Sequence, residues 1–84
     1  MTPKAVERIQ TGVRLEKSLL KVLKGLAEYC DMSLGDLLEG IVLHSFEGQP
    51  PFSDATLKTI RELKKVYNCS LTAADSHTLR EDAS

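Results

Sequence analysis

The first 24 residues concentrate the basic side chains of a chain whose net charge is only −1. They hold six lysines and arginines against two glutamates, whereas residues 25–56 hold six acids and no lysine or arginine. A cluster of cations attracts polyanions, because neutralised phosphates release their condensed counterions. The first chemistry that the residues suggest is therefore binding of a polyanion. The basic residues are Lys4, Arg8, Arg14, Lys17, Lys21 and Lys24.

Catalysis and metal binding have no comparable support. The sequence shows no carboxylate pair beside a base, no glycine loop for a phosphate, and no cysteine and histidine at catalytic spacing. Cys30, Cys69, His44 and His77 are potential ligands, but their spacing matches no metal site. Cys30 falls on an apolar stripe and is expected to be a reduced, buried thiol. We predict no enzyme, no metal and no cofactor.

Residues 8–15 alternate between apolar and polar side chains, which is the period of a strand with one buried side. We predict a strand over about 8–15. Its buried side would consist of Ile9, Thr11, Val13 and Leu15, and its exposed side of Arg8, Gln10, Gly12 and Arg14.

Two helices are predicted next, over about 17–30 and 34–47, because apolar residues recur there at three- and four-residue spacing. Ser33 is the expected N-cap of the second helix, and Gly48 its left-handed stop. The two stripes are Leu19, Val22, Leu23, Leu26, Ala27 and Cys30, then Leu34, Leu37, Leu38, Ile41, Val42 and Phe46.

A single strand would leave its backbone groups without partners, and about 40 residues bury too little surface to fold alone. The order of these elements resembles the ribbon-helix-helix family of transcriptional repressors, which includes the Arc and methionine repressors. The resemblance covers about half of the chain. It implies a mostly α homodimer with one short strand per subunit: an intersubunit two-stranded antiparallel ribbon, a four-helix core and here an additional C-terminal helix.

The resemblance also implies which residues contact double-stranded DNA. The outward strand positions that read bases in the major groove correspond to Gln10, Gly12 and Arg14, with Arg14 suited to guanine and Gln10 to adenine. The phosphate contacts would come from Lys4, Arg8, Lys17, Ser33, Leu34 and Gly35, the last three through the start of a helix. The sequence departs from the family at Gly12, which has no side chain to read with, at Asp31, where glycine is common, and at Asp36, whose charge would face a phosphate.

The whole chain divides into a flexible basic arm over 1–7, the ribbon-helix-helix domain over 8–48 and a C-terminal extension over 49–84. In the extension, Ser53 and an apolar stripe predict a helix over about 54–67, and a short helix is expected over about 73–79. We expect the first of these helices to pack on the dimer over Leu43. The alternative is a helix that stays mobile until a partner protein binds it.

The sequence thus predicts a cytoplasmic, dimeric, sequence-specific DNA-binding regulator of transcription, acting as a repressor. No apolar run is long enough for a membrane span and no signal peptide is recognisable, so no membrane partner is expected. The alternative function is an antitoxin-like or other protein-interaction module whose C-terminal segment binds a partner protein, with DNA binding secondary or lost.

Overall fold

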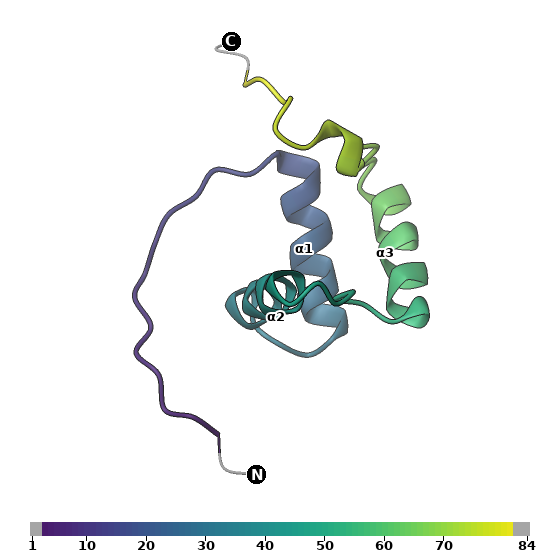
Figure 1. Ribbon diagram of the computed structural model, residues 1–84. Coiled ribbons are helices and arrows are strands. Elements are labelled where there is room, and N and C mark those ends of the chain that lie inside the picture. The colour runs from purple at the N-terminus through teal and green to yellow at the C-terminus, as the bar shows by residue number, and fades with distance from the viewer. Residues whose placement is uncertain (1–2, 82–84) are drawn as a thin grey trace.

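The computed structural model describes residues 3–81, which form a small all-helical fold (Figure 1). Three helices of 13 residues each, α1 (Lys17–Tyr29), α2 (Leu34–Phe46) and α3 (Asp54–Val66), are followed by a 3-10 turn, η1 (Ala73–Asp75). The helices begin at the expected residues and end one residue earlier than expected. Residues 1–2 of the predicted arm and 82–84 of the predicted extension lie outside the described residues.

The predicted strand over 8–15 is wrong, and with it the ribbon-helix-helix fold. The structure contains three helices and no strand or sheet within residues 3–81. Residues 3–16 are extended and run outside the helices (Figure 1), and no backbone hydrogen bond joins residues 3–15 to another described segment. The side expected to be buried is exposed, with Ile9 at 82% and Val13 at 72%. Alternation alone does not make a strand, because a strand also needs a neighbouring backbone.

Helix α1 begins where the Glu16 carboxylate accepts the backbone N–H groups of Ser18 and Leu19, at 3.1 and 2.9 Å. These are two of the first N–H groups of the helix, which lack intrahelical acceptors. The two bonds, together with one from the Ser18 hydroxyl, lower the pKa of Glu16, the hydroxyl bond having the largest effect. The apolar stripe of α1 then supplies most of the core, with Val22, Leu26 and Ala27 buried.

The turn between α1 and α2 depends on one unusual backbone conformation. Asp31 has a φ of 58°, in the left-handed region where glycine is most at ease. The chain then restarts at Ser33, whose hydroxyl accepts the N–H of Asp36 at 3.1 Å. Leu37 is brought onto Leu26 and Ala27, which completes the core. Ser33 is therefore the cap that the sequence predicts, and the backbone at Asp31 is one that glycine adopts without strain.

Helix α2 ends at the predicted stop. Gly48 has a φ of 70°, and Gln49 donates its N–H to the carbonyl of His44 at 2.9 Å. This closes the last turn in the manner of a Schellman motif. The outer half of the predicted α2 stripe is not covered, however, since Val42 and Phe46 are exposed within residues 3–81.

Helix α3 packs beside α1 (Figure 1), and Gly25 explains why it can. A Cβ atom on Gly25 would lie 3.2 Å from Leu63 Cδ2 and 3.4 Å from Tyr67 Cε2. The absence of a side chain on α1 therefore lets α3 approach closely. The expected position of α3 over Leu43 is wrong, because α3 packs against α1 and Leu43 stays 64% exposed.

The segment after α3 turns back toward the core. Asn68 adopts a φ of 54°, which ends the helix, and Cys69 is buried. The Lys64 ammonium donates to the carbonyl of Leu71 at 2.6 Å. The short helix expected over 73–79 is confined to η1, because the capping box of Thr72 and Asp75 supports a single turn.

Candidate nucleic-acid interface

The extended segment carries all three predicted base-reading positions on its surface. Gln10, Gly12 and Arg14 are exposed. A Cβ atom on Gly12 would meet nothing within 4 Å, so packing does not require glycine there. The backbone around Gly12 is therefore open to a ligand from the side of that residue.

Arg8 is engaged with the acidic side of α2. Its Nε donates to Glu39 Oε2 at 3.0 Å and its Nη2 donates to Glu39 Oε1 at 2.9 Å. Asp36 Oδ1 lies 3.8 Å from the same Nη2. We call Arg8, Asp36 and Glu39 the Arg8 cluster. The hydrogen bonds from Arg8 lower the pKa of the Glu39 carboxyl, so this group is held in its charged form.

Arg14 also faces an acid from a distant part of the sequence. Its guanidinium forms an ion pair with the carboxylate of Glu81, in the segment after η1. Both arginines of the extended segment are therefore paired with carboxylates, whereas the sequence predicts that both contact DNA.

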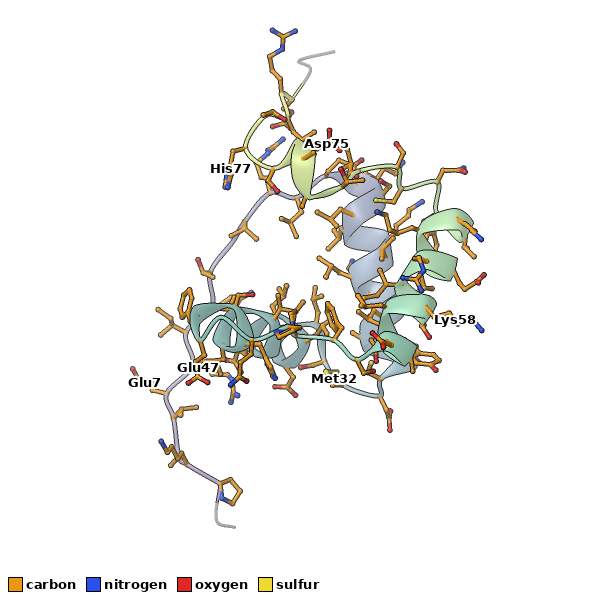
Figure 2. All side chains as sticks on the ribbon, turned by 45° about the vertical axis from the view of Figure 1, so that its right-hand side comes forward. Glu7, Met32, Glu47, Lys58, Asp75 and His77 are labelled. Atoms are coloured by element: carbon orange, nitrogen blue, oxygen red, sulfur yellow. The ribbon has the colours of Figure 1, made fainter. Side chains whose placement is uncertain are left out.

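The start of α2 lies beside the same segment. Glu7, Arg8 and Thr11 line an open groove of about 640 Å³ together with Ser33 and Gly35. Figure 2 shows Glu7 on the extended segment where the segment passes α2. The structure thus brings Arg8 next to two of the three predicted phosphate-binding residues of α2.

The groove at the start of α2 is poorly suited to a phosphate in this arrangement. The N–H groups of Leu34 and Gly35 have no acceptor within the helix, and they would favour an anion. The carboxylates of Glu7, Asp36 and Glu39 line the same groove and would repel it. Asp36, at which the sequence departs from the ribbon-helix-helix family, therefore lies in the structure where its charge would repel a phosphate.

A row of lysines extends the basic surface along α1. Lys17, Lys21 and Lys24 lie four and three residues apart, so they share one side of the helix, and all three are exposed. No salt bridge involves them within residues 3–81. Among these three lysines, only Lys17 is a predicted phosphate contact; the four- and three-residue spacing is the signal in the sequence that also places Lys21 and Lys24 on this surface.

The part of the chain that the structure describes contains no group of three His, Cys, Asp or Glu residues placed to hold a metal ion. Cys30 and Cys69 are free thiols, Cys30 half-buried and Cys69 buried. None of the helices within residues 3–81 combines the length and apolar character of a membrane span.

Comparisons with family models, with characterised proteins and with solved structures found no match for this chain.

Proposed function

We propose that this protein binds double-stranded DNA and regulates transcription as a repressor, with the N-terminal segment and α1 as the contact surface. The observation that carries the proposal is the exposed, extended segment over residues 3–16, which holds Lys4, Arg8 and Arg14 and runs directly into the lysine row of α1. An extended chain can enter a groove of DNA, as the arms of several DNA-binding domains do.

Within this surface, the side chains divide into two roles. Arg14 and Gln10 have the donor geometry to contact guanine and adenine edges. Lys4, Arg8 and Lys17 would contact phosphates, which contribute affinity at every sequence. Lys21 and Lys24 join this second group because they continue the exposed row.

We further propose that the protein acts as a homodimer, held by an apolar surface shared by the N-terminal segment and α2. Val6, Leu38, Val42 and Leu43 line one open hollow of about 770 Å³, so the apolar side chains of the two segments belong to one surface. Phe46, at the end of α2, is 82% exposed. Monomeric proteins seldom expose apolar patches of this kind. A dimer would also place two basic segments on one particle.

A second candidate function is a protein-interaction module that uses the C-terminal segment. It is favoured by Val66 and Leu79, which are 68% and 54% exposed. A protein-interaction module predicts that a protein partner contacts residues 66–79. The DNA-binding proposal predicts instead that DNA contacts residues 4–24.

The test is a fluorescence anisotropy titration with DNA from upstream of the protein's own gene, repeated at several salt concentrations. Lys4→Ala and Lys21→Ala should each weaken binding to all sequences and reduce the salt slope by about one unit. Arg14→Ala should relax the preference at one base pair. Lys58→Ala is the control, because Lys58 points into solvent from α3 (Figure 2).

Affinity that is independent of salt, or equal losses in Lys58→Ala and Lys21→Ala, would contradict the proposed surface. No binding of duplex DNA at low salt would contradict the function itself.

A further inference from the structure

We propose, on the basis of the proposed function, that the acidic side of α2 is an internal competitor of DNA: it binds the N-terminal segment through Arg8 and must release it before this segment can contact a duplex.

The Arg8 cluster is built as a recognition site for a guanidinium group. Glu39 accepts two hydrogen bonds, one on each carboxylate oxygen, from two nitrogens of Arg8. Asp36 lies one helical turn before Glu39 and adds a second negative charge at 3.8 Å. The two acids are three residues apart, so both face the same side of α2. This side of the helix therefore presents to the segment a pair of anions, much as a DNA backbone would.

The competition follows from the geometry of arginine. Its donors form a rigid fork that binds a carboxylate or a phosphate in the same bidentate manner. The fork edge formed by Nε and Nη2 is occupied by Glu39, so that edge of Arg8 cannot contact a phosphate at the same time. The carboxylates of Glu7, Asp36 and Glu39 also line the groove, and they would keep a phosphate away from Ser33 and Gly35.

A second ion pair would also compete with DNA, because it occupies Arg14, one of the predicted base-reading residues. Arg14 is paired with Glu81, which follows η1 and is 67 residues away in sequence. Both arginines of the extended segment are thus neutralised by acids from outside it. The lysine row of α1 is free of such pairs within residues 3–81. The first encounter with DNA would therefore use the lysines, and the arginines would follow.

Competition from these carboxylates should lower the affinity of the protein for DNA without abolishing DNA binding. The side chains of Arg8 and Glu39 are 62% and 48% exposed, and exposed ion pairs are weak. We expect each pair to reduce the affinity for DNA by about two- to fivefold.

The decisive experiment compares Glu39→Gln with Glu62→Gln in DNA titrations. Both changes remove one negative charge from an exposed helix position, but Glu62 forms no ion pair within the described residues. We expect Glu39→Gln to bind DNA about two- to fivefold more tightly than Glu62→Gln. In an Arg8→Ala background the difference between the two changes should be smaller, because Glu39 has lost its ligand and only its repulsion of a phosphate at the groove remains.

A second measurement needs no DNA. Amide ¹⁵N relaxation of residues 6–13 should show faster motion in Glu39→Gln than in the unmodified protein, and no change in Glu62→Gln. Equal DNA affinities for the two variants would overturn the competition while leaving DNA binding intact. A freed segment in Glu39→Gln with no DNA binding by any variant would overturn the proposed function, and with it the competition.

Discussion

The N-terminal segment and the helical region differ in what holds them in place. Helices α1 to α3 are fixed by caps, by a shared apolar core around Leu26 and by the close approach of α3 over Gly25. Residues 3–16 contribute apolar side chains to the surface and depend on exposed ion pairs for their contacts with α2. The difference shows that a small protein can combine a packed helical core with an extended segment whose charged contacts to that core are exposed.

The sharpest test of this contrast is a pair of truncations at apolar positions. Leu26→Ala removes a side chain that is 2% exposed and should lower the free energy of unfolding by about 2–5 kcal/mol. Val13→Ala removes a side chain that is 72% exposed and should leave the helices intact, with a change within about 0.5 kcal/mol. Urea unfolding followed by circular dichroism at low protein concentration measures both. A large loss for Val13→Ala would mean that the segment belongs to the core.

The next largest effect concerns the apolar surface of α2. If two copies meet there, Phe46→Ser should weaken self-association by roughly tenfold or more, because burial of a phenylalanine contributes about 1.5–3 kcal/mol. Tyr29→Ser is the matched control, since Tyr29 is also an exposed aromatic residue but lies at the end of α1. Sedimentation velocity at several concentrations gives both constants. A protein that is monomeric at all concentrations would exclude the dimer.

Substitutions at Gly25 and Gly40 distinguish the effect of tertiary packing on stability from the effect of helix propensity. Gly25→Val would place its branched side chain against Leu63 and Tyr67, and it should destabilise the packing of α3 by about 1–3 kcal/mol. Gly40→Ala meets nothing within 4 Å and should stabilise α2 by about 1 kcal/mol. Amide hydrogen exchange reports the result at Ile60 to Lys64, where only the Gly25 variant should exchange faster. Unchanged exchange in Gly25→Val would contradict the packing of α3 against this glycine.

The same contrast explains what the sequence can and cannot predict. The three helices, the caps at Ser33 and Ser53 and the stop at Gly48 follow from local rules that act within a few residues. The predicted strand over 8–15 is absent from the structure, because alternation describes only the side chains of a segment. A strand also requires a second backbone to pair with. The position of α3 depends on contacts between residues about 40 positions apart, and Gly25 could have indicated it only once the partner helix was known.

The candidate interface was predictable in composition but not in its pairings. Charge asymmetry identifies the basic segment, and the spacing of Lys17, Lys21 and Lys24 indicates a row. The contact of Arg8 with Glu39 spans 31 residues, and nothing local in the sequence specifies it. Asp36 and Glu39 were visible as acids on one side of α2, yet their role depends on where the extended segment runs.

The smallest expected effect is electrostatic, and it tests the pairing of Arg8 directly. Because the hydrogen bonds from Arg8 lower the pKa of Glu39, this interaction stabilises the folded arrangement above the ordinary pKa of a glutamate, about 4.3, and is lost as the pH falls through the lowered value. Arg8→Ala should therefore raise the pKa of Glu39 toward its ordinary value.

Carboxyl ¹³C chemical shifts followed between pH 2.5 and 7 measure this pKa in both proteins. Lys4→Ala is the control, since it removes one positive charge from the same segment without breaking the Arg8 cluster. A Glu39 pKa that is the same in the unmodified protein and in Arg8→Ala would show that the segment does not rest on α2 in solution, and the N-terminal segment would then be independent of the helical region at every pH.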